Sequence, residues 1–267
     1  MDPKSAPEPR LSATVLLVRD RDELEVLMVR RHYQIDFASG ALVFPGGKAS
    51  DDDHHNEWPD CIDGNFTGYQ RIARIAAVRE AFEESGILLC RSSEARGEGA
   101  PLVGADIADK LSPHRAAVDK GELSFLELIR DHALVLALDT LIHFGHWITP
   151  TMMPKRFDTH FYFAPTPPAQ LASHDGHETT DAMWLTAPEA LRMEAAGEAN
   201  IIFPTRMNLR KLAMVDTVPG GIAQFSSEPV VTVLPEVGKS DDGRPCLHIP
   251  DVAGYGQTTE LLERVKV

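Results

Sequence analysis

A helix in the first third of the chain constrains the fold more than any other feature. Thr67 and Gln70 have the spacing of a capping box, and Gly86 is a typical residue at a helix end, so we expect a helix from Thr67 to Ser85. At 100° per residue, an apolar side lies opposite a side that bears three carboxylates. The apolar side consists of Ile75, Val78 and Phe82, and the carboxylates belong to Glu80, Glu83 and Glu84. This division predicts one face buried on a core and one strongly acidic face.

The three carboxylates repel one another because they lie within about one helical turn. Arg79 stands four residues before Glu83 and offsets part of this repulsion. A divalent cation such as Mg²⁺ or Mn²⁺ would offset more, since these ions prefer oxygen ligands. The alternative interpretation is a solvated acidic face. Small residues on this side would let another stretch of backbone come close; they are Ala73, Ala76 and Ala77.

A second motif, Phe44-Pro45-Gly46-Gly47, follows a short apolar run that is predicted to be a strand. Glycines permit an unusual backbone path and a close approach of the main chain. On its own, the motif is also typical of a simple turn.

Strand and helix signals alternate along the chain, which predicts an α/β fold. Strands are expected at 11–18, 24–29, 41–44, 141–148, 157–164, 182–186 and 230–234, the first two as a hairpin. Further helices are expected at 124–132, 188–197 and 204–215, and polar loops at 48–66 and 91–112. We divide the chain into a Pro-rich flexible arm (1–10), one domain (11–215) and a C-terminal extension packed on that domain (216–267).

Charge and composition exclude several classes of protein. The 40 acidic and 26 basic residues give a formal net charge of −14, which argues against a general binder of nucleic acid or anionic membranes. The longest aliphatic run, 133–138, is too short to span a bilayer. Three cysteines without paired spacing fit a reducing compartment, and the first residues lack an apolar signal core, so we expect a cytoplasmic protein.

Together the two motifs resemble the Nudix box. That box is a Gly, five residues, a Glu, seven residues and then Arg-Glu-apolar-x-Glu-Glu-x-Gly-apolar. Gly47 and the segment Arg79–Ile87 match it, whereas Asp53 replaces the first Glu. Between Asp53 and Arg79 lie 25 residues instead of seven, so we place an insertion of 18 residues at about 54–71.

An interrupted box is similar to the branch of the Nudix family that includes the peroxisomal coenzyme A diphosphatase of animals. Further similarity lies in segments 156–161 and 174–178 and in Trp184-Leu185. The resemblance implies an α/β/α sandwich around a mixed β-sheet.

The resemblance also implies a metal-dependent pyrophosphohydrolase, in which water attacks one phosphorus of a nucleoside diphosphate linked to another moiety. The metal would be Mg²⁺ or Mn²⁺, and the ligands implied are Glu80, Glu83, Glu84 and the Gly46 carbonyl. A glutamate such as Glu83 or Glu84 would orient or deprotonate the water, and Arg79 would fix a glutamate rotamer. Glu178 is the candidate for a further catalytic carboxylate on a late loop; the alternative is a strand-edge glutamate.

Two basic pairs are candidates for contacts with substrate phosphates. They are Arg30 with Arg31, and Lys155 with Arg156. The alternative is that each pair only balances nearby acidic residues.

The resemblance favours coenzyme A or acyl-coenzyme A as substrate, with phosphopantetheine and 3′,5′-ADP as products. A pyrophosphatase acting on ADP-ribose or NADH is the first alternative, and a Nudix-like ligand sensor without catalysis is the second. The presence of all three glutamates favours an enzyme. The family resemblance also implies a homodimer, which no residue pattern fixes.

Overall fold

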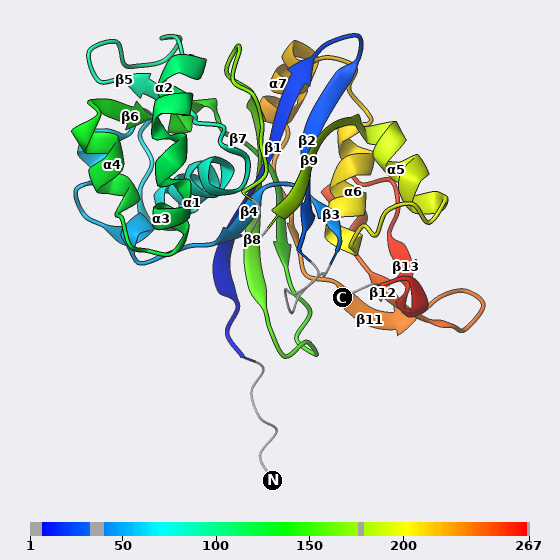
Figure 1. Ribbon diagram of the computed structural model, residues 1–267. Helices are drawn as coiled ribbons and strands as arrows, with labels where there is room; N and C mark the ends of the chain where they lie inside the picture. Colours follow the sequence, from blue (N-terminus) through cyan, green and yellow to red (C-terminus); the bar gives the residue numbers. More distant parts are fainter. Residues whose placement is uncertain (1–6, 33–39, 176–178, 266–267) are drawn as a thin grey trace.

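The computed structural model describes residues 7–32, 40–175 and 179–265. At its centre lies an eight-stranded mixed sheet with the order β10-β7-β8-β1-β2-β3, in which β4 also pairs with β1 and β9 with β2 (Figure 1). Its strands are β1 (Arg10–Asp20), β2 (Leu24–Arg31), β3 (Leu42–Val43), β4 (Gly46–Lys48), β7 (Ile142–Ile148), β8 (Phe157–Pro165), β9 (Thr179–Thr186) and β10 (Thr232–Val233). β1 runs parallel to β8, and β10 runs parallel to β7.

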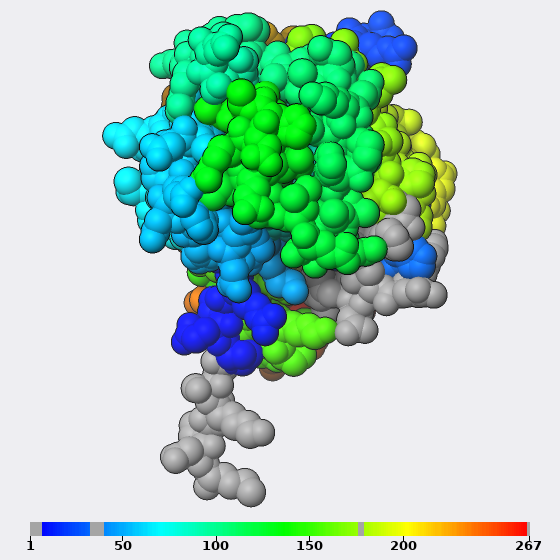
Figure 2. All heavy atoms as spheres, turned by 60° about the vertical axis from the view of Figure 1, so that its left-hand side comes forward, coloured from blue at the N-terminus to red at the C-terminus, as the bar shows by residue number. Residues whose placement is uncertain are grey.

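One face of the sheet is covered by the layer on the left of Figure 1. This layer contains α1 (Gly68–Ser85), α2 (Ala105–Leu111), α3 (Arg115–Asp119), α4 (Phe125–Asp131) and the small sheet of β5 (Cys90–Ser92) and β6 (Leu134–Leu136). In Figure 2, where this side is turned forward, the green and teal residues of α2 to α4 form much of the outer surface. α1 lies beneath them and packs on β1 and β4.

The opposite face carries α5 (Ala187–Ala195), α6 (Phe203–Leu212), α7 (Val218–Ser227) and a three-stranded sheet of β11 (Glu236–Lys239), β12 (Pro245–His248) and β13 (Thr259–Leu261). The sheet separates two buried hydrophobic clusters, and alternate residues of β1 belong to different ones. Val15 and Leu17 belong to the cluster on the α1 side, whereas Leu16 and Val18 belong to the cluster on the opposite side. The expected α/β/α sandwich around a mixed sheet is confirmed.

Several local predictions were wrong. Residues 91–112 are not a plain loop, because they contain α2, in which Ala108 and Leu111 are buried. Lys48 is predicted to lie in a loop, but Gly46–Lys48 forms a strand paired with β1, which excludes the alternative of a simple turn at the glycines. Thr67 precedes α1, but its side chain makes no capping hydrogen bond. Among the described residues, no helix has both the length and the apolarity to cross a membrane.

The insertion in the Nudix-like box is folded against the α1 layer. Trp58, in the short 3₁₀ segment Trp58–Cys61, is fully buried and donates from Nε1 to Asp52 O at 2.8 Å. The Asp52 carboxylate in turn accepts hydrogen bonds from the first residues of α4, such as Phe125 N at 2.9 Å. Asp52 thereby links both Trp58 and the acidic loop to α4.

Candidate active site

The last two turns of α1 carry the acidic segment. Gly86 ends the helix in a left-handed conformation, at φ 74°, and its amide donates to Phe82 O. Glycine adopts this conformation without steric cost, so the helix ends directly after the glutamates. Glu80, Glu83 and Glu84 are only 8%, 5% and 3% exposed. Their burial excludes the solvated acidic face.

Arg79 lies at the centre of a buried ion-pair network. Its Nε and Nη2 donate to the two carboxylate oxygens of Asp53, at 3.0 and 2.9 Å. Its Nη1 donates to Glu80 Oε1 at 3.0 Å and to Glu83 Oε2 at 2.8 Å. Burial alone would lower the pKa of Arg79, but the charges of Glu80, Asp53 and Glu83 outweigh this effect and raise it well above its ordinary value. Asp53 orients Arg79 in spite of the interrupted spacing.

β4 lies directly against this acidic face. The Gly46 amide donates to Glu84 Oε2 at 3.0 Å. A Cβ added to Gly47 would lie 2.4 Å from Glu80 Oε1, so a larger residue would displace that carboxylate. The close backbone approach expected beside α1 is thus made by the Gly-Gly pair. The contact that Gly46 makes with Glu84 comes from its amide; the predicted role of its carbonyl stays a prediction.

The acidic cluster is short of positive charge. Within the described residues, Glu83 Oε1 is buried and has no hydrogen-bond partner. Burial and the charge of Glu80 raise the pKa of Glu83 from 4.5 to about 8, although Arg79 acts in the opposite direction. A buried carboxylate oxygen without a partner, next to further carboxylates, suits a hard divalent cation. Glu80, Glu83 and Glu84 therefore fit the Mg²⁺ or Mn²⁺ that the sequence implies.

Arg115 of α3 anchors the end of α1. Its Nε and Nη2 donate to Glu83 O at 3.0 and 2.9 Å, and its Nη1 donates to Ser173 Oγ at 3.0 Å. Ser173 N donates to Ser85 O at 2.9 Å. These bonds tie the loop before β9 to the helix end that carries the glutamates.

The same loop leads to the predicted residue Glu178, which lies outside the described residues. On either side of it, Asp175 Oδ1 accepts from Thr179 N at 3.0 Å, and Thr179 Oγ1 donates to Glu84 O at 3.4 Å. The chain therefore contacts the end of α1 immediately after residue 178.

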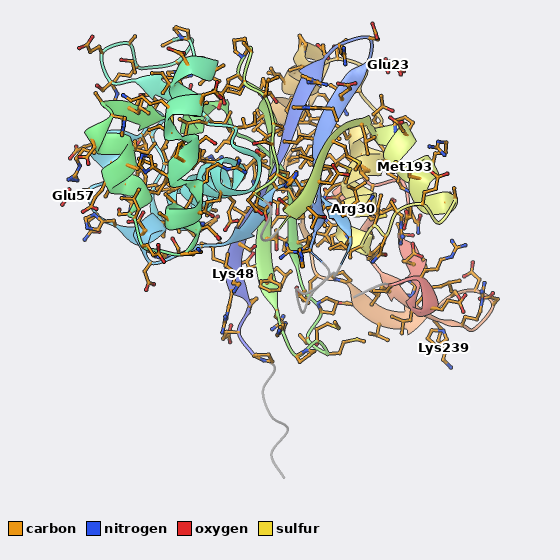
Figure 3. The ribbon with its side chains drawn as sticks, viewed as in Figure 1. Glu23, Arg30, Lys48, Glu57, Met193 and Lys239 are labelled. Carbon is orange, nitrogen blue, oxygen red and sulfur yellow. The ribbon has the colours of Figure 1, made fainter. Side chains whose placement is uncertain are left out.

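The first basic pair, Arg30 and Arg31, forms the end of β2. Arg30 is labelled near the centre of Figure 3. Arg31 pairs with Thr179 across β2 and β9, and Thr179 also contacts the end of α1. Arg31 Nε is buried and lacks a hydrogen-bond partner in the part of the chain that the structure describes. The second pair lies at the start of β8, where Lys155 is exposed and Arg156 donates to two backbone oxygens, Thr149 O at 3.0 Å and Pro7 O at 2.8 Å.

Comparison with known proteins assigns this arrangement to a family. The model of the NUDT19 Nudix domain matches residues 68–212, which is more than half of the chain. The chain belongs to the NUDT19 Nudix domain family. It is a Nudix pyrophosphohydrolase, and Nudix hydrolases generally use divalent metal ions.

Relatives and a solved structure agree with this assignment. The chain is 25% identical to an acyl-coenzyme A diphosphatase NUDT19 of Xenopus laevis, over 83% of this chain and 69% of that protein. It is 27% identical to the protein of the same name from Gallus gallus, over 77% of this chain and 65% of that protein. A crystal structure of a NUDIX hydrolase from Alicyclobacillus acidocaldarius has a TM-score of 0.70 and 26% identity, covering 83% of this chain and 99% of that chain.

Sequence reasoning missed two features of the Nudix domain. Arg115 lies in a polar stretch without any motif, so nothing in the sequence indicated its contact with α1. A cluster of histidines on β7 and β8 was also missed, although Asp158 and His160 alternate within one predicted strand and must share a face.

Proposed function

We propose that the protein hydrolyses the phosphoanhydride of coenzyme A or acyl-coenzyme A to phosphopantetheine and 3′,5′-ADP. The observation that carries the proposal is the buried cluster of Glu80, Glu83 and Glu84 against Gly46–Gly47 in a NUDT19 Nudix domain. The names of the Xenopus and chicken relatives support the substrate class.

In this proposal Glu80, Glu83 and Glu84 hold the divalent ion. When bound, such an ion neutralises pyrophosphate oxygens and lowers the pKa of an attacking water. Glu83 or Glu84 orients this water or accepts its proton, with Glu178 as a further candidate. Arg79 acts as a positioning residue, because it bonds to Glu80 and Glu83 and is itself held by Asp53.

Arg30 and Arg31 are proposed to contact a substrate phosphate, such as the 3′-phosphate of coenzyme A. The support is that Arg31 pairs with Thr179, which contacts Glu84 O, and that its Nε has no partner among the described residues. Guanidinium groups bind phosphate oxygens through paired hydrogen bonds. Lys155 and Arg156 are a second candidate pair, although Arg156 already donates to two backbone carbonyls.

A substrate panel with Mg²⁺ or Mn²⁺ tests the proposal. It contains coenzyme A, acyl-coenzyme A, ADP-ribose and NADH, and the products are identified by mass. We expect selective release of 3′,5′-ADP, and we expect Glu84→Gln to lower kcat by about 100- to 10,000-fold. Glu94→Gln, which changes an exposed glutamate, is the matched control and should leave kcat unchanged.

Other outcomes would contradict specific parts of this proposal. Preference for ADP-ribose or NADH would overturn the coenzyme A assignment and leave the hydrolase in place. No turnover of any substrate, with binding of one of them retained, would favour the ligand sensor. A homodimer and a cytoplasmic location stay predictions, to be checked by light scattering and by fractionation of cells that express the full chain.

A further inference from the structure

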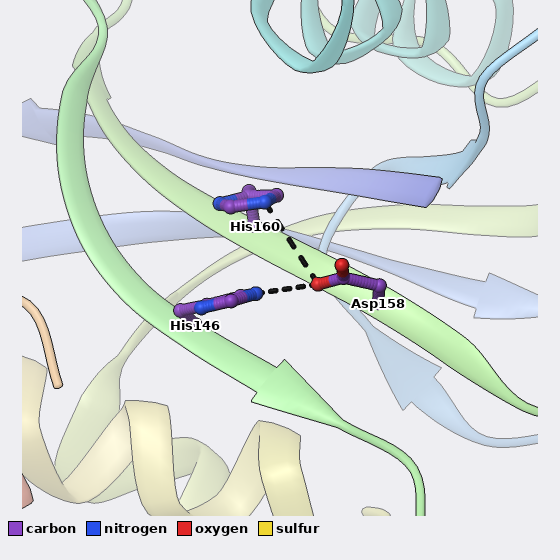
Figure 4. Close-up of side chains that lie close together, drawn as sticks. All are labelled: His146, Asp158 and His160. Carbon is purple, nitrogen blue, oxygen red and sulfur yellow. Dashed lines mark hydrogen bonds and ion pairs between the residues drawn. The ribbon is translucent and has the colours of Figure 1, made fainter. Parts of the chain in front are cut away.

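Three side chains on β7 and β8 gather on the side of the sheet that faces α1. His146 and His160 lie directly opposite each other in the antiparallel register, and Asp158 precedes His160 by two residues and so shares its face. One ligand atom from each of His146, Asp158 and His160 lies within 4.8 Å of the others. Figure 4 shows the two imidazole rings, stacked with centroids 4.1 Å apart, and dashed lines from both to Asp158.

Neighbouring residues orient the imidazole rings of His146 and His160 toward the Asp158 carboxylate. His146 Nδ1 lies 2.8 Å from Thr232 Oγ1, and His160 Nδ1 lies 3.1 Å from His143 Nε2. Each Nδ1 atom is therefore engaged on the outside, and each Nε2 atom points at Asp158 Oδ1. Metal-binding histidines are typically fixed in this way, with one ring nitrogen on the ion and the other on an outer hydrogen-bond partner.

His160 is the most buried of the three ligands. His160 is only 3% exposed, so the Nε2 lone pair faces a largely protein-lined space. Two imidazoles and one carboxylate form a nitrogen and oxygen donor set that suits Zn²⁺ and related ions.

The cluster borders a pocket of about 300 Å³. Tyr69, Gln70 and Arg74 of α1 line its wall, together with Val230 and Thr232 on the β10 side. This volume leaves room for water or a small anion at an open coordination position. Arg74 is 8% exposed, and in the described part of the chain its buried Nε has no hydrogen-bond partner, so it can contact an anionic fourth ligand.

This pocket is distinct from the glutamate site. Ala13 of β1 pairs with His160 on one side and with Gly47 on the other, so one strand separates the two sites across the sheet. Along α1, the ring of Tyr69 lies beside His160 at a centroid distance of 5.5 Å, and Glu80 follows about 16 Å further along the helix axis.

We propose that His146, Asp158 and His160 bind a divalent transition-metal ion of the zinc class, with a fourth position open to the pocket. Thr232 and His143 engage Nδ1 of the two imidazole rings and leave each Nε2 for the ion. The ion would link β7 to β8 beside the first turns of α1, at a site independent of the glutamates.

Metal binding by the purified full-length chain tests this directly. The protein is stripped with EDTA and refilled with excess Mg²⁺ to occupy the glutamates. Zn²⁺ binding is then measured by calorimetry and by metal analysis after gel filtration, and Co²⁺ serves as a spectroscopic probe of nitrogen and oxygen ligation. We expect one Zn²⁺ per chain, and visible ligand-field bands with Co²⁺.

The variants separate this site from the catalytic one. Asp158→Asn and His146→Gln should lose stoichiometric Zn²⁺, whereas Glu84→Gln and the exposed His54→Gln should retain it. Thr232→Val keeps all three ligands and should weaken Zn²⁺ binding by about tenfold through loss of the outer contact. Circular dichroism of the metal-free variants checks that each is folded.

Three results would overturn the proposal. One is wild-type protein that retains no Zn²⁺. Another is Zn²⁺ binding lost in Glu84→Gln but kept in Asp158→Asn, which would place the ion at the glutamates. The third is binding of inorganic phosphate that requires Arg74 and no metal, which would make the pocket an anion site.

Discussion

Replacing Glu83 with Gln should stabilise the metal-free protein while it abolishes turnover. The Glu83 carboxylate is 5% exposed and lies beside Glu80, and its pKa is raised from 4.5 to about 8. Between these pH values the folded state retains a proton that the unfolded chain has released, so the free energy of unfolding falls as the pH rises. The shift corresponds to a penalty of about 3 kcal/mol at pH 7, which Gln would not carry.

Urea unfolding of EDTA-treated protein at a series of pH values measures this penalty. The free energy of unfolding of Glu83→Gln should equal that of wild type near pH 4.5, the ordinary pKa of glutamate. It should exceed the wild-type value by an increasing amount toward pH 8. At pH 7 we expect a melting temperature about 6–12 °C above that of wild type. Added Mg²⁺ or Mn²⁺ should reduce this difference in melting temperature, because the ion stabilises the wild type.

The exposed control Glu94→Gln should follow the wild-type pH profile. If Glu83→Gln were no more stable than wild type at pH 8, or had the same pH slope, ionised Glu83 would carry no burial penalty. The argument that this cluster needs a cation would then fail.

Three further substitutions test other parts of the site. Gly47→Ala brings a Cβ to 2.4 Å from Glu80 Oε1 and should lower kcat on the order of 100-fold, measured with coenzyme A, with at most about 3 kcal/mol lost in urea unfolding. Asp53→Asn removes a buried charge from Arg79 and should lower the free energy of unfolding by about 3 kcal/mol; an unchanged urea midpoint would contradict this. Arg31→Gln should raise the KM for coenzyme A about tenfold without changing the KM for dephospho-coenzyme A, and an equal effect on both would exclude a 3′-phosphate contact.

Local patterns along the chain predicted most of the fold. The helix ending at Gly86 and the hairpin of β1 and β2 follow from capping, periodicity and alternation within short windows, and each of these acts through near neighbours. α2 and the strand β4 escaped prediction because their formation depends on distant partners. β4 has only three residues and is a strand solely because it pairs with β1.

The acidic part of the site was predictable because its members share one helix, where spacing fixes their relative position. Arg115 was not predictable, since its position beside Glu83 O results from packing of α3 on α1. The same holds for the histidine cluster. The strand pattern places Asp158 and His160 on one face, but only the register of β7 against β8 brings His146 to them.

α1 borders both sites, the histidine pocket and the glutamate cluster. α1 begins at Gly68, well before Arg79, and ends at Ser85 directly after the glutamates. Its N-terminal end carries Tyr69 and Gln70 into the wall of the histidine pocket, and its C-terminal turns carry the glutamates. Trp58, fully buried, anchors the inserted segment that leads into α1. The two ends of α1 therefore contribute to two separate pockets, while Arg79 and its carboxylate partners keep their own contacts.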